Sequence, residues 1–203
     1  MDRVFPRGAN AAAVTSRSTP GLEPPASGFD LVATIDDDRA FRAWYERTAP
    51  RVYAYLLSRT GSPAQAEELL QRVFVEVIRR PAAFDGRADA IPWLIGIARH
   101  QLGRQYREQA QADRWWRGGR VREISPMTGP PESRATDLAL DIRAALQSLP
   151  TLQRAALVFR FLDGLSVRDV ADHLGRSQAA TESLLRRGRR QFELAYRGGS
   201  DAD

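Results

Sequence analysis

Cysteine is absent from the 203 residues of the chain. Disulfide bonds, thiolate ligands for zinc and cysteine nucleophiles are therefore excluded. The two histidines, His100 and His173, are interpreted as isolated surface or groove residues rather than metal ligands. Since the sequence also shows no phosphate-binding loop and no nucleophile–base pair, we expect no metal site, no cofactor and no enzymatic activity.

Long apolar runs are also absent. No stretch approaches the roughly 20 apolar residues of a transmembrane helix. Arg3 and Arg7 are not followed by the apolar run of a signal peptide. No segment alternates apolar and polar residues with the period of two that is typical of strands. The sequence therefore predicts an all-α, soluble protein of the cytoplasm.

Lysine is the third absence, because all 30 basic residues are arginine, and the formal net charge is +5. Guanidinium groups bind phosphates in a bidentate manner and stack on bases. A GC-rich genome also replaces lysine with arginine, and we attribute the missing lysine to that cause. The basic excess agrees with a polyanionic partner without establishing one.

The first 35 residues are rich in Ala, Pro, Gly, Ser and Thr and lack periodicity. They predict a disordered tail, followed by a helical domain over residues 36–111. The run Asp36 to Asp38 suits a helix N-terminus. Pro50 predicts a kink or break in the helical region that follows. The apolar residues of that region are Phe41, Trp44, Tyr45, Val52, Leu56 and Leu57.

A second helix start is predicted at Ser62, which can cap the helix, with Pro63 in its first turn and Gln65 placed for a capping box. An apolar stripe follows, made of Ala66, Leu69, Leu70, Val73, Phe74, Val77 and Ile78. The opposite, polar face carries Glu67, Glu68, Gln71, Arg72 and Glu76. Such a face is usually only solvated, but it can also dock a partner.

A loop over residues 84–90 leads to a helix that Pro92 opens. The buried face of this helix is predicted to contain Trp93, Leu94, Ile97, Ala98 and Leu102. Positive charge along it comes from Arg99, His100, Arg104 and Arg107. Aromatic and basic groups together can bind single-stranded nucleic acid by stacking and phosphate contacts. A core position is the alternative for Trp93.

Periodicity fails over residues 112–135, where glycines and prolines predict a flexible linker. Trp115 and Trp116 are unusual in a linker, and packing on a domain and packing on a partner both remain open. A second helical domain is expected over residues 136–198. Its first two helices contain the apolar residues Leu138, Ile142, Ala145, Leu146, Leu149, Leu152, Ala155, Ala156, Phe159 and Leu162.

Residues 165–192 predict a helix-turn-helix. Ser166 caps the first helix with Asp169 in its first turn, Gly175 permits a left-handed turn, and Ser177 caps the second helix. The second helix is strongly basic in its C-terminal half. Such a unit suits the major groove of DNA. A plain helical hairpin with arginines at the negative end of its dipole would show the same spacing.

Three stretches in this order resemble the bacterial sigma factors of the extracytoplasmic-function type. They are AEELLQRVFVEV (residues 66–77), FDGRADAIPWLIGIARH (residues 84–100) and LQSLPTLQRAALVFRFLDGLSVRDVADHLGRS (residues 146–177). The resemblance covers residues 41–196. It implies a sigma-2-like domain, a linker and a sigma-4-like helix-turn-helix domain. It also implies a subunit that directs core RNA polymerase to promoters, melts them and starts transcription.

The resemblance assigns roles by position. Polymerase binding falls to Glu67, Glu68, Gln71 and Arg72. The minus-ten element would be melted and held by Arg87, Asp89, Trp93, Arg99, His100, Arg104 and Arg107, where stacking on a flipped base offsets the cost of unpairing. The minus-thirty-five duplex would be read by Arg176, Ser177, Gln178, Glu182, Ser183, Arg186, Arg187 and Arg190.

This chain departs from the family pattern at three places. Glu182 stands where the recognition helix commonly has lysine, Ile91-Pro92 replaces a usual Phe-Arg, and the linker is basic rather than acidic. A carboxylate is repelled by phosphates but accepts from cytosine, so the first departure bears on promoter sequence rather than on DNA binding.

The resemblance further implies control by an anti-sigma factor, of which the sequence itself shows nothing. The alternative function is a stand-alone helix-turn-helix regulator that binds operator DNA as a dimer without polymerase. Residues 66–100 favour the sigma factor, because such a regulator does not need them.

Overall fold

The computed structural model describes residues 29–86, 89–115 and 134–200, and all regular elements in these ranges are helices. The predicted all-α class is confirmed. Most of the predicted tail (residues 1–28) and of the predicted linker (residues 116–133, with Trp116) lies outside the described ranges. The elements are α1 (Leu31–Asp36), α2 (Asp38–Thr60), α3 (Pro63–Arg79), the 3₁₀ turn η1 (Pro81–Ala83), α4 (Ala90–Trp115), α5 (Arg134–Gln147), α6 (Thr151–Leu157), the π-helical segment η2 (Val158–Leu162), α7 (Val167–Leu174) and α8 (Gln178–Ser200).

The N-terminal domain consists of α1–α4 around an apolar core. The fully buried side chains Leu56, Leu69, Val73 and Leu94 come from α2, α3 and α4. Each such burial contributes about 1.5–3 kcal/mol relative to exposure. Among the predicted apolar positions, however, Ile78 on α3, Ile142 on α5 and Leu162 in η2 are exposed.

The described helices include one that begins before the predicted boundary at residue 36. Leu31 on α1 is only 2% exposed and belongs to the core. The Asp30 carboxylate caps α1 by accepting from the Ala33 amide at 3.1 Å. Asp36 ends α1, and Asp37 caps α2. A six-residue helix is too short to show periodicity, which explains the missed element.

The helix α2 continues through Pro50 without the predicted break. Proline removes one backbone donor and crowds the preceding turn. The buried Trp44, Val52 and Leu56 lie before and after the proline on the face that packs against α3 and α4. We infer that this packing compensates for the lost hydrogen bond.

Ser62 caps α3, as predicted, and Pro63 is its first residue. The capping box is wrong, because the Gln65 side chain does not return to the cap. Its Oε1 accepts instead from Nε2 of Gln105 on α4, at 3.0 Å. This amide pair links α3 to α4.

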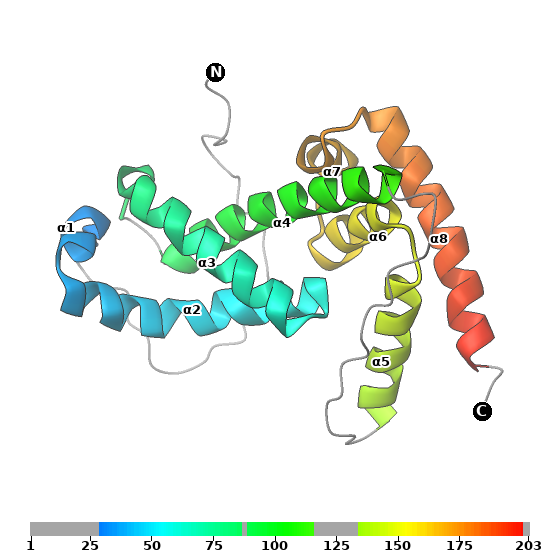
Figure 1. Ribbon diagram of the computed structural model, residues 1–203, viewed down its shortest axis with the longest axis horizontal. Coiled ribbons are helices and arrows are strands. Elements are labelled where there is room, and N and C mark those ends of the chain that lie inside the picture. Colours follow the sequence, from blue (N-terminus) through cyan, green and yellow to red (C-terminus); the bar gives the residue numbers. More distant parts are fainter. Residues whose placement is uncertain (1–28, 87–88, 116–133, 201–203) are drawn as a thin grey trace.

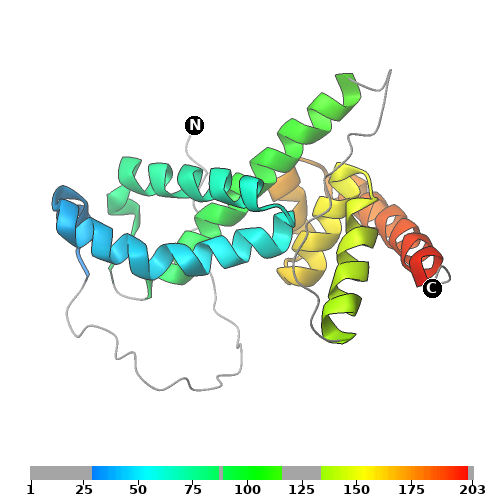
Figure 2. The same ribbon diagram turned by 60° about the horizontal axis from the view of Figure 1, so that its bottom comes forward.

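The helix α4 continues four residues beyond the predicted domain end at residue 111, and its C-terminal part projects beyond α2 and α3 (Figure 2). Its last residue, Trp115, is 89% exposed. Trp115 therefore does not pack on a domain in this structure.

The C-terminal domain consists of α5, α6, η2, α7 and α8. The predicted caps are confirmed, because Ser166 accepts from the Asp169 amide at 3.1 Å and Ser177 accepts from the Ala180 amide at 3.2 Å. Gly175 ends α7 at φ +60°, in the left-handed region. The π turn η2 was not predicted. It is closed by a hydrogen bond from the Asp163 amide to the Val158 carbonyl, five residues back.

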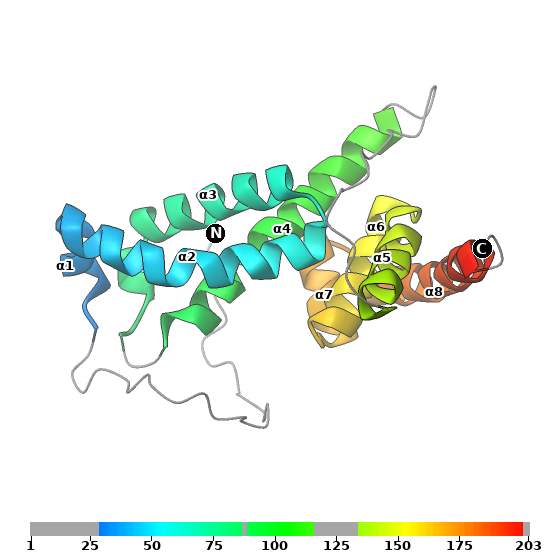
Figure 3. The ribbon, with the colours of Figure 1, turned by 90° about the horizontal axis from the view of Figure 1, so that it is seen from below.

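The two domains lie against each other, with α4 passing along α6 and α7 (Figures 1 and 3). Tyr106 on α4 meets Phe159 of η2 edge to face, with 5.9 Å between ring centroids. Leu102 of α4 and Val170 and Leu174 of α7 belong to the same apolar core. The core is therefore continuous across the domain boundary.

Candidate nucleic-acid interface

The helix-turn-helix places the start of α8 on the surface. The first helix, α7, buries Val170, Ala171 and Leu174 against the domain. Gly175 and the Ser177 cap then fix the short turn into α8. This geometry leaves the first turns of α8 free to approach a duplex, as the major groove requires.

The residues predicted to read the minus-thirty-five duplex gather at that end of the domain. Gln178, Glu182, Arg186 and Arg190 are exposed and follow each other at every fourth position, so they form one stripe. Arg176 and Ser177, in the turn, and Arg187 are exposed beside it. Ser183 is half-buried, and its carbonyl accepts from Nε of Arg187 at 3.3 Å.

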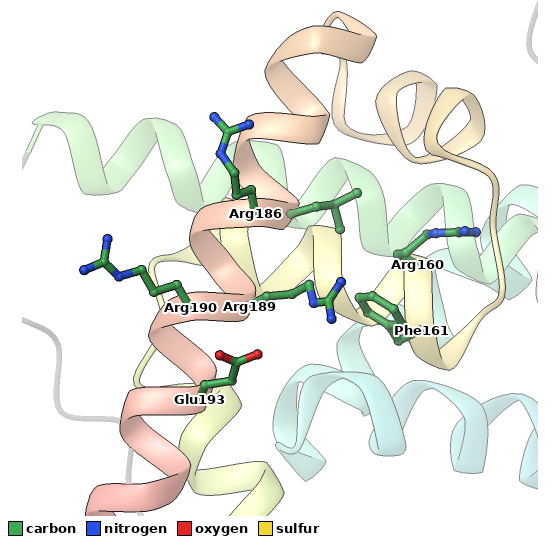
Figure 4. Close-up of a pocket in the computed structure, with 7 residues that line it drawn as sticks. Arg160, Phe161, Arg186, Arg189, Arg190 and Glu193 are labelled. Atoms are coloured by element: carbon green, nitrogen blue, oxygen red, sulfur yellow. The ribbon is translucent and has the colours of Figure 1, made fainter.

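Arginines on α8 point to two sides. Arg186 and Arg190 extend away from the domain, whereas Arg189 points toward Phe161 of η2 (Figure 4). The Arg189 guanidinium lies 5.8 Å from the centre of the Phe161 ring. A shallow groove forms between these residues, Arg160 and Glu193. Sequence reasoning missed this groove, because it depends on the π turn.

The polar face of α3 has the predicted residues on the surface. Glu67, Glu68 and Gln71 are exposed. Arg72 pairs with Glu68 at 2.6 Å and with Glu108 of α4 at 3.6 Å. A surface groove between α3 and α4 is lined by Glu68, Gln71, Arg72, Val75, Glu76, Arg79, Gln101, Arg104 and Glu108.

Asp89 stands directly before α4 and interacts with the first turn of that helix and with Arg51. Its Oδ1 accepts from the Ile91 amide at 3.1 Å, and its Oδ2 lies 3.5 Å from the Arg51 guanidinium. Trp93 is half-buried against Phe84, with 5.1 Å between ring centroids. Its Nε1 is buried without a hydrogen-bond partner in the described ranges. The predicted site residue Arg87 lies outside them.

The predicted basic line along α4 divides between two surroundings. Arg104 is exposed and pairs only locally, with Glu108 at 2.8 Å. Arg99, His100 and Arg107 face the C-terminal domain instead. The Arg107 guanidinium donates to the His173 carbonyl, and the Arg99 Nε lies 3.8 Å from the Asp163 carboxylate.

The interpretation of the histidines as isolated is wrong. The rings of His100 and His173 lie 4.6 Å apart between centroids, from α4 and α7. The pKa of His173 is lowered to about 4, mainly by burial and to a smaller degree by His100, Arg99 and Arg107, while Asp169 opposes the shift. Both rings are expected to be neutral at pH 7. No cluster of three or more potential metal ligands occurs in the described part of the chain.

A polar cluster around Asp163 was not predicted. Its carboxylate, whose side chain is 1% exposed, accepts from Arg59 at 2.9 Å and from the Tyr55 hydroxyl at 3.0 Å. Burial raises the pKa of Tyr106 to about 12, so its hydroxyl stays protonated and donates to the Arg59 carbonyl at 3.1 Å. Asp163 lies 104 positions from Arg59 and 108 from Tyr55, so no local pattern pairs these residues.

Two family models match the chain. The model for sigma-70 region 2 matches residues 44–112, and the model for sigma-70 region 4 matches residues 139–192. Both predicted domains therefore have counterparts in one family. The region 2 match does not favour the alternative of a stand-alone regulator. Among the described residues, no helix is both long and apolar enough to span a membrane.

Curated relatives carry the same assignment. The ECF RNA polymerase sigma factor SigK of Mycolicibacterium vanbaalenii is 33% identical over 159 residues, covering 75% of this chain and 79% of the relative. The RNA polymerase sigma factor CarQ of Myxococcus xanthus is 30% identical, covering 73% and 84%. The ECF RNA polymerase sigma factor SigX of Bacillus subtilis is 27% identical, covering 77% and 86%.

A solved structure has the same fold. The sigma factor RpoE of Bartonella quintana, in complex with the anti-sigma factor NepR, aligns with a TM-score of 0.50 at 21% identity. The alignment covers 78% of this chain and 98% of that chain. With the two region matches and the curated relatives, this places the protein in the ECF RNA polymerase sigma factors, the sigma-70 family members that direct transcription initiation.

Proposed function

We propose that the two domains divide promoter recognition between α3, α4 and α8. The observation that carries the proposal is the separation of three exposed polar surfaces on one chain. These are the mixed-charge face of α3, the aromatic and basic start of α4, and the stripe on α8. We keep the functional boundaries at residues 36–111 and 136–198, with α1 added to the first domain.

The polar face of α3 is the proposed polymerase-binding surface. Glu67, Glu68 and Gln71 are exposed, and Arg72 is held between two carboxylates. Val75 and Ile78 on the same helix are also exposed and add apolar surface. A polar face with apolar neighbours suits a stable protein interface, where apolar contacts supply affinity and charges supply specificity.

The loop before α4 and the start of α4 are the proposed minus-ten site. Trp93 is held by Phe84 and is half-buried, so the exposed part of its ring can contact a base while its Nε1 stays buried. Arg104 offers its guanidinium to the strand backbone. Asp89 supports this site by capping α4, so its contribution is to position the loop that carries Arg87.

The α8 stripe is the proposed minus-thirty-five site. Arg186 and Arg190 supply phosphate or guanine contacts, and Gln178 and Glu182 supply base readout. We further propose that the protein has no catalytic activity of its own, acts in the cytoplasm with RNA polymerase, and is sequestered by an anti-sigma factor. The sigma factor aligned above was solved with such a partner.

The experiment separates the three surfaces in one reconstituted transcription assay. Glu67→Ala with Glu68→Ala should lower the affinity for core polymerase. Arg104→Ala, although Arg104 borders the α3 groove, should reduce strand opening more than assembly, with opening measured by permanganate reactivity of unpaired thymines. Arg186→Ala should leave assembly intact and weaken promoter binding before melting.

The matched control is Arg197→Ala, which removes an exposed arginine near the C-terminal end of α8. It should affect none of the three steps. If the α3 double variant assembles normally, or if all variants fail at the same step, the proposed division is wrong.

A further inference from the structure

The two domains are joined by a polar seam, defined here as Tyr55, Arg59, Arg99, His100, Arg107, Asp163 and His173. The Asp163 carboxylate is its centre on the η2 side, held by Arg59 and Tyr55 from α2 and approached by Arg99 from α4. In the Arg59–Asp163 ion pair, the side chains are 19% and 1% exposed. Removing one charge from such a pair costs stability, because the other charge stays buried without a partner.

The α7 side of the seam packs just as closely on α4. A Cβ atom added at Gly103 would lie 2.8 Å from the His173 carbonyl oxygen. That same carbonyl accepts from Arg107. The His173 ring contacts the His100 ring at 4.6 Å and the Phe159 ring at 5.3 Å between centroids, tilted against each.

Closure occupies the groups that would hold a DNA strand. Arg107 donates to the His173 carbonyl, and the Arg99 Nε lies buried 3.8 Å from the Asp163 carboxylate. The second domain therefore covers part of both guanidinium groups and limits the approach of a strand phosphate to them. The closed arrangement therefore competes with the strand contacts that we propose for α4.

The His100–His173 contact makes closure depend on protonation. The groups that face His173 are His100, Arg99 and Arg107 from α4, Asp169 from its own helix, and the uncharged Phe159 ring. Two arginines and one carboxylate leave a net positive charge around His173, so a further positive charge on its ring is disfavoured. The Nδ1 atom of His173 is buried without a hydrogen-bond partner in the described ranges, so an added proton would find no acceptor.

We propose that the seam is an acid-sensitive latch, which closes the basic face of α4 against the second domain and opens when the histidine pair is protonated. The competition with DNA rests on the proposed function of α4, whereas the latch itself does not. The sign follows from linkage. A histidine that titrates near 6.5 when free and lower when closed favours opening as the pH falls below about 6.5. One such proton shifts the equilibrium by at most about tenfold per pH unit.

The first experiment measures closure in the free chain. Because the sequence has no cysteine, Arg42→Cys on α2 and Gln191→Cys on α8 accept a dye pair for energy transfer. Transfer at neutral pH defines the closed arrangement, and it should fall between about pH 6.5 and 4, while far-UV circular dichroism keeps its helical signal. His173→Gln should move this fall to lower pH. A profile identical to that of the parent chain would overturn the proposal.

The second experiment opens the latch without acid. Asp163→Asn at neutral pH should lower the energy transfer, whereas Asp172→Asn, on the exposed side of α7, should not. Where Asp163→Asn loses its helical signal, Arg59→Gln replaces it. Unchanged transfer in the folded variant contradicts the latch.

The same variants then report on α4. A fluorescein-labelled single-stranded oligonucleotide of mixed sequence should bind Asp163→Asn several-fold more tightly than the parent, in the absence of polymerase. If transfer falls and the oligonucleotide affinity stays unchanged, the latch stands and the strand-binding role of α4 is wrong. The two claims therefore fail separately.

Discussion

Gly103 is a residue at which the two domains pack closely. It is buried on α4, and the backbone of α7 occupies the space that a side chain would need. Gly96 lies two turns earlier on the same helix and has nothing within 4 Å of an added Cβ atom. The two glycines therefore lie on one helix, but only Gly103 is packed against another element.

Substitution by alanine should separate these two effects. Gly96→Ala should stabilise the protein by up to about 1 kcal/mol, because alanine favours a helix. Gly103→Ala should destabilise it by about 1–3 kcal/mol, because the extra methyl group overpacks the contact. Urea unfolding of both variants measures the difference. Equal gains in stability would show that α7 does not lie against Gly103 in solution.

Individual residues were predictable where their role is local. The caps Ser62, Ser166 and Ser177 and the left-handed Gly175 were predicted from neighbours within four positions. Gln65 was not, because its amide found a partner forty positions away. Asp163 had no signal at all, since a single aspartate before a glycine usually marks a turn.

Among the elements, α2 contains a residue that disfavours a helix, Pro50. Pro50 is exposed inside the helix and cannot donate to the preceding turn. Pro50→Ala should therefore raise the free energy of unfolding, by up to about 3 kcal/mol. Thermal and urea unfolding measure this gain, with Ala54→Gly, also exposed on α2, as the opposite control. A loss of stability in Pro50→Ala would mean that the helix depends on the proline.

The recognition helix α8 gives an electrostatic prediction. Arg186→Ala and Arg187→Ala should each weaken binding of the polymerase-bound protein to a promoter duplex, by about 1 kcal/mol. Each should also reduce the slope of log affinity against log salt by about one, because one phosphate contact is lost. Arg197→Ala should leave both unchanged. Identical salt slopes in all three variants would remove α8 from the duplex interface.

Element-level prediction succeeded where apolar spacing extends over several turns, as in α3 and α7. It failed for α1, which is too short to show a period. It also failed for η2, because apolar spacing predicts that the helix simply continues and does not reveal the extra residue of a π turn. Phe161, within the π turn, is exposed, and Asp163, directly after it, points into the seam.

At the scale of the whole molecule, the sequence predicted two helical domains but not their mutual packing. A linker of arginines, glycines and prolines suggests independence, and nothing in it indicates a seam. The seam depends on pairs such as Arg59 with Asp163 and His100 with His173, which only the tertiary arrangement brings together.

The seam also predicts a pH dependence of stability for the free chain. His173 titrates near 4 when folded and near 6.5 when unfolded, so the unfolded state binds more protons between these values. Stability should therefore fall as the pH drops from about 6.5 toward 4. Thermal unfolding across this range measures it, and His173→Gln should flatten the decline. A decline that His173→Gln leaves unchanged would assign it to other groups.

This chain directs RNA polymerase to its promoters. The most direct measurement is in vitro transcription from a library of genomic promoter fragments, using core polymerase with and without the protein. Transcripts should appear from a specific subset of fragments only when the protein is present, and they should be lost with Arg186→Ala. Transcription that is the same with and without the protein, together with tight duplex binding by the chain alone, would contradict this role.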